Sequence, residues 1–249
     1  MSISACNLSI VPLRAEPSHR SELVSQVLFG ETFEILVDGI DFSKIRLIDT
    51  KYEGWIQKHQ FAKVVLSGVK RNTIVDLSGA LAIAGSKMVH LLHGTVISGS
   101  SITIGEETYN IEGNLRECKL TDFNTEFTKL IQYYTNTPYM WGGRSMFGID
   151  CSGFSQVIYR HFGISLLRDA YQQAENGNAV DFLTEIKAGD LAFFDNEVGK
   201  ITHVGVMVDS ETIIHAAGRV RIDKMDNQGI FNSELNRYTH KLRIVKRYF

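Results

Sequence analysis

The spacing of apolar residues changes once along this chain, near residue 118, and that change limits the folds it can adopt. Before residue 118, short strand-like runs alternate with turns; residues 32–37 and 42–48, for example, flank Asp38-Gly39, a pair typical of tight hairpins. After residue 118, apolar side chains recur at helical spacing, at Phe123, Phe127, Leu130, Ile131 and Tyr134. The chain is therefore predicted to have an all-β part followed by a part that contains helices.

The all-β part is predicted to contain two small barrels. About five brief strands fit into residues 1–65, and this density of short strands is typical of a small barrel. A second β-rich stretch covers residues 66–118, where residues 89–94 loosely repeat the pattern of residues 24–30. This repetition favours an internal duplication, so residues 66–118 are predicted to form a second β domain.

Residues 119–249 are predicted to form one α+β domain. The first helix must end before Pro138, and a second helical pattern begins at Cys151. Four strand-like runs come later, at residues 190–194, 203–208, 212–217 and 242–246. Helices that come first and strands that follow indicate an α+β fold and not a repeating βαβ unit.

The charge balance and the cysteine content exclude several classes of protein. The chain has 26 basic and 28 acidic residues, so it lacks the strong basic patch of nucleic-acid-binding proteins. No apolar run reaches the roughly 18–20 residues that span a bilayer, so we expect no membrane partner. Cys6, Cys118 and Cys151 form no CxxC pair, which argues against a disulfide framework or a thiolate zinc site. Because the start also lacks a secretory signal, we expect the cytoplasm.

One of these cysteines has the surroundings of a nucleophile. Cys151 follows Asp150, a good N-cap residue, and therefore opens the second predicted helix. A thiol at a helix start faces unpaired N–H groups and the positive end of the helix dipole, which favours the thiolate. Taken alone, a cysteine in this place is more often structural.

Two histidines strengthen the catalytic interpretation. A thiol nucleophile needs an imidazole within hydrogen-bond reach, and that imidazole needs a third group to fix its tautomer. If residues 209–211 turn the chain as a tight hairpin, His203 and His215 lie directly opposite each other on one face. The alternative is two unrelated histidines on a half-exposed hairpin, and a slip of one residue in the register would favour it.

Five motifs in order resemble the NlpC family of papain-like cell-wall peptidases. They are Tyr-x-Trp-Gly-Gly from Tyr139, Asp-Cys-Ser-Gly from Asp150, Gly-Asp-Leu-x-Phe-Phe from Gly189, His-Val-Gly from His203 and Ile-His-Ala from Ile214. The similarity covers residues 120–249, and the N-terminal half resembles bacterial SH3 domains. The combination is similar to cytoplasmic dipeptidyl-peptidases that release L-alanyl-γ-D-glutamate from murein peptides by cutting before the diamino acid. It implies a papain-like catalytic domain that follows two SH3-like barrels.

The resemblance implies a catalytic role for four residues. Cys151, His203 and His215 match the family's triad as nucleophile, base and orienting residue. The backbone N–H of Cys151, with the hydroxyl of Tyr139, would stabilise the oxyanion. Trp141, in the same motif as Tyr139, is expected to pack in the core.

The resemblance also implies residues that bind substrate. Asp150 and Ser152 match positions that hold the free amine of the peptide, although helix capping is an equal alternative for Asp150. Tyr52 and Glu16 of the first SH3-like domain, with Glu22 as a second choice for the acid, are expected to close one end of the cleft. The family commonly has a serine at the position of Ala170, and this chain lacks that hydroxyl, so Asp169 or a water is expected to substitute for it.

The expected partner is a murein tripeptide or tetrapeptide, and the protein is expected to be a monomer. No cofactor and no metal are expected, since the spacing of His90 and His93 resembles a metal site but lacks an acidic partner. Two other functions remain open: a papain-like amidase or acyltransferase, and a non-catalytic protein that binds wall peptides.

Overall fold

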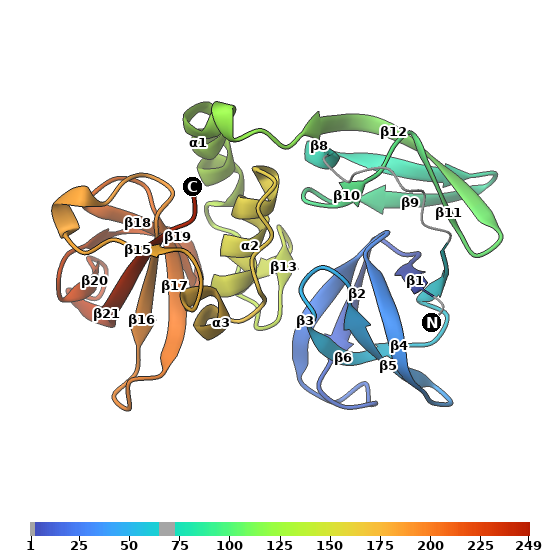
Figure 1. The fold of residues 1–249 in the computed structure, drawn as a ribbon, viewed down its shortest axis with the longest axis horizontal. Coiled ribbons are helices and arrows are strands. Elements are labelled where there is room, and N and C mark those ends of the chain that lie inside the picture. The colour runs from blue at the N-terminus through green and yellow to red at the C-terminus, as the bar shows by residue number, and fades with distance from the viewer. Residues whose placement is uncertain (1–2, 65–72) are drawn as a thin grey trace. The chain divides into compact units, whose positions relative to one another are not determined.

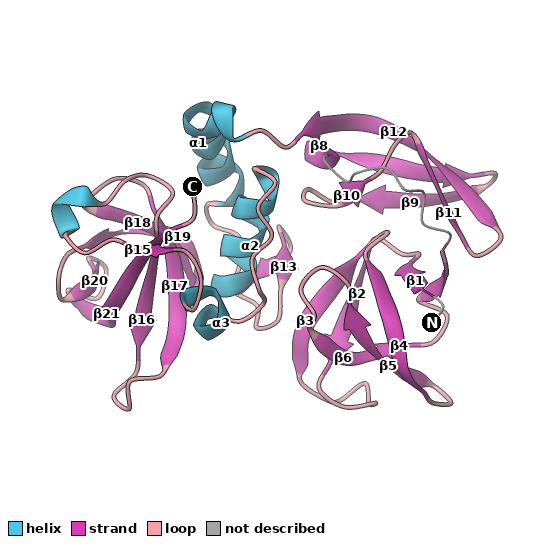
Figure 2. Cartoon of the chain, in the orientation of Figure 1, coloured by secondary structure: helices cyan, strands magenta, loops and turns pink. Residues whose placement is uncertain are grey.

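The protein divides into two compact units. The computed structural model describes residues 3–64 and 73–249. The first unit comprises residues 1–120 and 160–165, and the second comprises residues 121–159 and 166–249. Figure 2 shows many more strands than helices, with the α-helices after the β-rich N-terminal part. The domain boundary predicted between residues 65 and 66 lies outside the described residues.

The first unit begins with an antiparallel sheet whose strands follow one another in the order β3-β2-β6-β5-β4-β1-β7 (Figure 1). Residues that point into this sheet's core alternate with exposed ones, as in β2, where Val11 and Leu13 are buried. The described strands are β1 (Ile3–Cys6), β2 (Ile10–Arg14), β3 (Leu23–Leu28), β4 (Thr32–Asp38), β5 (Phe42–Leu47), β6 (Glu53–Gln57) and β7 (Phe61–Lys63).

A second antiparallel sheet follows, in the order β10-β8-β12-β11, with β9 paired to β8. Its two long strands pair with a register shift after Gly113, whose φ of 129° no β-branched or bulky residue adopts readily. That this sheet is a second SH3-like barrel stays a prediction. The strands are β8 (Thr73–Ala84), β9 (Lys87–Leu91), β10 (Val96–Ile97), β11 (Ser101–Ile104) and β12 (Glu107–Glu117).

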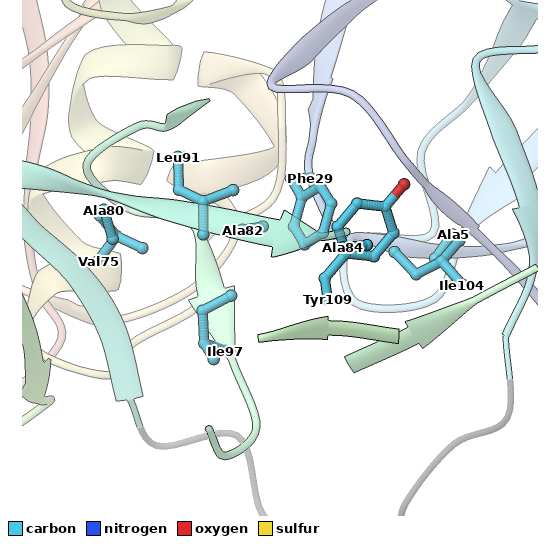
Figure 3. Close-up of a cluster of buried hydrophobic side chains, with 10 residues drawn as sticks. All are labelled: Ala5, Phe29, Val75, Ala80, Ala82, Ala84, Leu91, Ile97, Ile104 and Tyr109. Carbon is cyan, nitrogen blue, oxygen red and sulfur yellow. The ribbon is translucent and has the colours of Figure 1, made fainter. Parts of the chain in front are cut away.

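A single buried cluster joins these two sheets. Figure 3 shows the ring of Phe29, which follows β3, beside the ring of Tyr109 from β12. The two rings meet edge to face with centroids 5.3 Å apart. Ala5 of β1 and Val75 of β8 are buried in the same cluster. The two β parts of the first unit are therefore stabilised by one shared core.

The second unit begins with helices at the predicted positions. Helix α1 (Phe123–Tyr134) buries Phe127, Leu130 and Tyr134, and it ends before Pro138 as predicted. Helix α2 (Cys151–His161) begins at the predicted cysteine. The short elements of this unit are η1 (Leu120–Asp122), β13 (Arg144–Ser145), β14 (Gly148–Ile149), α3 (Ala170–Ala174) and η2 (Leu183–Glu185).

The large sheet of the second unit has the order β15-β21-β16-β17-β18-β19-β20, and β20 also pairs with β21, so the sheet curls back on itself. All four predicted strands are present, and the sequence patterns missed β15, β19 and β20. The members are β15 (Asn178–Ala179), β16 (Leu191–Asp195), β17 (Ile201–Met207), β18 (Thr212–Ala217), β19 (Arg219–Met225), β20 (Gly229–Asn232) and β21 (Arg237–Arg247).

The shared core of the first unit gives a stability prediction. Phe29→Ala should lower the free energy of unfolding by about 3–5 kcal/mol, because it removes a fully buried ring and leaves a cavity. Denaturant unfolding followed by fluorescence measures the loss. Ile40→Ala is the control, because its side chain is 91% exposed. Equal stability of the two variants would contradict a core that depends on Phe29.

Candidate active site

The carboxylate of Asp150 fixes the N-terminus of the helix that carries Cys151. Its Oδ1 accepts a hydrogen bond of 2.7 Å from the N–H of Gly153, the usual geometry of an N-cap. Its Oδ2 accepts a second bond, of 2.8 Å, from the N–H of Gly142 in the preceding loop. The glycines are required here, since a Cβ at position 153 would lie 2.2 Å from the carbonyl oxygen of Gly143. The two glycine motifs thus bring the loop and the helix start together.

Arg168 occupies the rest of the Asp150 carboxylate. Nη1 lies 3.0 Å from Oδ1 and Nη2 lies 2.5 Å from Oδ2, a bidentate pair. Nη1 also donates to the hydroxyl of Ser152, at 2.8 Å. All three residues are buried. Of the two interpretations of Asp150, this geometry supports capping, and it leaves neither Asp150 nor Ser152 an obvious vacancy for a substrate amine. Sequence patterns assigned no role to Arg168.

The two predicted histidines meet, although not in the predicted register. The turn covers residues 209–211 as predicted, but Val208 and Thr212 close it, so His215 lies opposite Gly205 and not opposite His203. His203 is a diagonal neighbour two positions along the same face. The shift of two residues keeps both side chains on one face of the sheet, because side chains alternate with a period of two. Nε2 of His203 therefore still lies 2.9 Å from Nδ1 of His215, with the two rings nearly perpendicular at 88°.

A carboxylate that the sequence patterns missed completes this chain of side chains. Oδ2 of Asp223 lies 3.0 Å from Nε2 of His215, and both side chains are buried. Burial alone would raise the pKa of Asp223, but hydrogen bonds from His215 and Arg221 hold the pKa below its usual value. Asp223 lies in β19, where Val220 and Asp223 are buried and Ile222 is exposed, so the apolar pattern of this strand gave no signal for it.

The ionised Asp223 determines where the protons lie. A carboxylate only accepts hydrogen bonds, so Nε2 of His215 carries a hydrogen. In a neutral imidazole the other nitrogen is then an acceptor, and Nδ1 of His215 accepts from Nε2 of His203. The remaining nitrogen of His203, Nδ1, is left without a hydrogen. The base is thereby held in the tautomer that can take a proton from a thiol.

The nucleophile itself is protected from water. Cys151 is 6% exposed, and burial raises the pKa of its thiol to about 12, with the charge of Asp150 acting in the same direction. The backbone N–H groups of Val204 and Ser152 act in the opposite direction. Burial therefore opposes the thiolate form that the helix start was expected to favour. Burial also lowers the pKa of His203 well below its usual value, with His215 and His240 adding to the effect.

Tyr139 is anchored through its backbone. Its N–H donates to the carbonyl of Gly218 at 3.0 Å, which fixes the backbone beside β18 and β19. Burial, followed by the charges of Cys151 and Asp150, raises the pKa of the phenol, so the hydroxyl remains a donor. Its role at the oxyanion stays a prediction. Trp141 is 59% exposed, so the expectation that it packs in the core was wrong.

The other predicted binding residues are distributed over the two units. Asp169 is half-buried at the N-cap of α3, which lies against β17, and its N–H donates to Oε1 of Gln172 at 3.0 Å. Glu16 is exposed in the turn between β2 and β3. Tyr52 is half-buried against the core of the first sheet. The binding roles of these three residues stay predictions.

A buried cysteine at a helix start and a His–His–Asp chain on neighbouring strands are the parts of a cysteine peptidase site. Comparison with known families agrees: residues 136–238 match the NlpC/P60 family, and residues 13–61 match the bacterial dipeptidyl-peptidase SH3 domain. The chain belongs to the NlpC/P60 family and is a cysteine peptidase with an SH3 domain.

Individual relatives agree with this assignment. A gamma-D-glutamyl-L-lysine dipeptidyl-peptidase of Bacillus subtilis (strain 168) is 29% identical over 212 residues, 77% of this chain and 71% of that protein. The murein DD-endopeptidase MepS/murein LD-carboxypeptidase of Escherichia coli (strain K12) is 30% identical over 156 residues, 58% of this chain and 77% of that protein. A crystal structure of an NlpC/P60 family protein from Bacillus cereus ATCC 10987 has the same fold, with a TM-score of 0.76, 19% identity and 99% coverage of both chains.

The proton order of the site gives a mutational prediction. Asp223→Asn should lower kcat for a murein peptide by about 100- to 10,000-fold, because an amide no longer dictates the tautomer of His215 and hence of His203. Steady-state kinetics measure the effect. Glu234→Gln is the matched control, because it removes an exposed carboxylate that also pairs with Arg221. Similar kinetics for the two variants would show that Asp223 does not control the base.

Proposed function

We propose that this peptidase hydrolyses the bond between γ-D-glutamate and the diamino acid in free murein peptides whose N-terminal L-alanine is unblocked. The dipeptidyl-peptidase SH3 domain at residues 13–61 and the relative named for a γ-D-glutamyl-L-lysine activity support this choice. The single observation that carries the hydrolytic step is the Asp223–His215–His203 chain with Cys151 beside the backbone of Val204. The product would be L-alanyl-γ-D-glutamate, released during cell-wall recycling.

The reaction follows from the proton order of the site. His203 Nδ1 takes the thiol proton as the sulfur of Cys151 attacks the carbonyl carbon, and Asp223 and His215 stabilise the resulting imidazolium. The N–H of Cys151 and the hydroxyl of Tyr139 stabilise the oxyanion. The imidazolium then protonates the departing amine of the diamino acid, which leaves a thioester. Water attacks the thioester, again with His203 as the base, and the thiol is restored.

We assign recognition of the free amine to an acidic residue other than Asp150, which caps helix α2. Asp150 is bound by Arg168 and two backbone N–H groups, so its charge is already used within the protein. We assign the ammonium group instead to Glu16 of the SH3 domain, with Tyr52. An ionised carboxylate beside an ammonium group makes a strong, charge-assisted hydrogen bond. The family commonly has a serine at the position of Ala170. Because Ala170 has no hydroxyl, Asp169 or a water would make the contact of that serine with the substrate.

A cytoplasmic location is part of the proposal. The cysteines of the described chain, Cys6, Cys118 and Cys151, are all unpaired, which suits a reducing compartment. No described helix has the length and apolar character needed to cross a membrane.

The products of one peptide test the proposed reaction. From L-Ala-γ-D-Glu-diamino acid tripeptide, mass spectrometry should show L-Ala-γ-D-Glu and the free diamino acid, and Cys151→Ala should yield neither. Cleavage at another bond, or transfer of the dipeptide to an added amine in preference to water, would identify an endopeptidase of other specificity or an acyltransferase. Binding of the peptide by the wild type without turnover would favour a wall-peptide binding protein.

Amine recognition has a test of its own. N-acetylation of the tripeptide should lower kcat/KM by at least about 10-fold, because it removes a charge that a carboxylate contacts. Glu16→Gln and Tyr52→Phe should raise KM for the free peptide and leave the slow reaction of the acetylated peptide unchanged. Asp41→Asn, which changes an exposed carboxylate of the same SH3 domain, is the control. Equal rates for both peptides would contradict the proposed subsite.

A further inference from the structure

A third histidine lies on the catalytic base. The ring of His240, from β21, stacks on the ring of His203 with centroids 4.1 Å apart and planes 25° apart. Thr239 fixes the orientation of this ring, since its Oγ1 lies 2.9 Å from Nδ1 of His240. Phe194 of β16 lies beside both imidazoles, with centroids 5.8 Å from His203 and 6.0 Å from His240. The base is thus enclosed on one face by rings that take no part in the proton chain.

A metal ion is the first ligand that such a cluster suggests. Nitrogens of His203, His215 and His240 all lie within 4.8 Å of one another. However, the lone pair of an imidazole nitrogen lies in the ring plane, and two stacked rings direct their lone pairs along nearly parallel planes. In addition, the facing nitrogens of His203 and His215 already share a hydrogen. The arrangement therefore fits three rings that pack against one another better than three nitrogens that bind one metal ion.

We propose that His240 is a positioning residue for the catalytic base. Its stacked ring confines the imidazole of His203 to the plane in which Nε2 faces His215, so that Nδ1 stays directed for proton transfer. When His203 becomes an imidazolium, the neutral π-face of His240 covers the new charge at a distance where a ring attracts a cation. This inference concerns the site of the proposed function but does not depend on which peptide is the substrate.

Burial favours the neutral form of the His240 ring. Burial lowers the pKa of His240 to about 4, with His215 adding to the effect and Asp223 opposing it. Asp223 is itself paired with Arg221. On β21, Arg243 lies 3.9 Å from Asp195 of β16. At neutral pH, a stack of two uncharged rings is therefore available when the reaction begins.

Substitutions of His240 distinguish the contribution of a stacked ring from that of the imidazole nitrogens. His240→Phe keeps an aromatic ring and should retain kcat to within about threefold. His240→Ala and His240→Gln remove the stack and should lower kcat by about 10- to 100-fold with KM little changed, because small misplacements of a catalytic group cost about this much. Gln is included because it fills the site if the Ala variant fails to fold.

A substrate-independent readout completes the test. The rate at which iodoacetamide alkylates Cys151 near neutral pH should fall in the Ala and Gln variants and persist in the Phe variant, since the misplaced base no longer draws the proton from the thiol. A loss in the alkylation rate without any peptide turnover in the wild type would count against the proposed substrate and not against His240. Full activity of the Gln variant, or a loss in the Phe variant as large as in the Ala variant, would overturn the proposal. The second outcome would mean that the imidazole itself is required, as a metal ligand or proton carrier.

Discussion

The hydrogen bond from His215 to the carboxylate of Asp223 is the interaction on which the chemistry of this molecule depends. A neutral imidazole has one donor and one acceptor, so a fixed carboxylate at one end of two linked rings determines every proton position up to the other end. The effect is directional: it leaves His203 with its acceptor free for the thiol. Without it, both rings would have two tautomers of similar energy, and part of the molecules would hold the base in the wrong form.

Two different structural elements position the residues of the candidate active site. Adjacent antiparallel strands β17, β18 and β19 place His203, His215 and Asp223 on one face, so their spacing follows from sheet geometry. Cys151 lies at the start of helix α2. A buried ion pair between Asp150 and Arg168 holds this helix start against the glycine loop. Breaking such a buried pair from one side leaves an uncompensated charge, so the pair enforces the position of the helix start.

The burial of the thiol changes how the nucleophile must be generated. The helix dipole alone would favour a thiolate, but a site closed to water raises the free energy of any isolated charge. Proton transfer from Cys151 to His203 then creates two opposite charges at once, close together. In our proposal, the stacked ring of His240 stabilises the imidazolium of His203 without adding a charge of its own.

Much of the site was predictable from sequence because it lies in local patterns. The cysteine at a helix start and the two histidines in consecutive strands needed only periodicity and a turn. The turn of the hairpin lies at residues 209–211 as predicted, but the predicted facing pair was wrong by two positions, because Val208 and Thr212 close the turn and Gly205 then faces His215. Asp223 and His240 were missed because they lie in strands whose closure into a curled sheet is a long-range property. The exposure of Trp141 was missed because an aromatic residue in a loop carries no periodicity to reveal its face.

The tautomers of His203 and His215 test the account most directly. Nitrogen-15 NMR of the histidine rings in the resting enzyme near pH 7 distinguishes protonated from unprotonated ring nitrogens. We predict that Nε2 carries the hydrogen in both rings and that both Nδ1 atoms are unprotonated in the wild type, with this order lost in Asp223→Asn. A hydrogen on Nδ1 of His203 in the wild type would contradict the account, because that base would have no site for the thiol's proton.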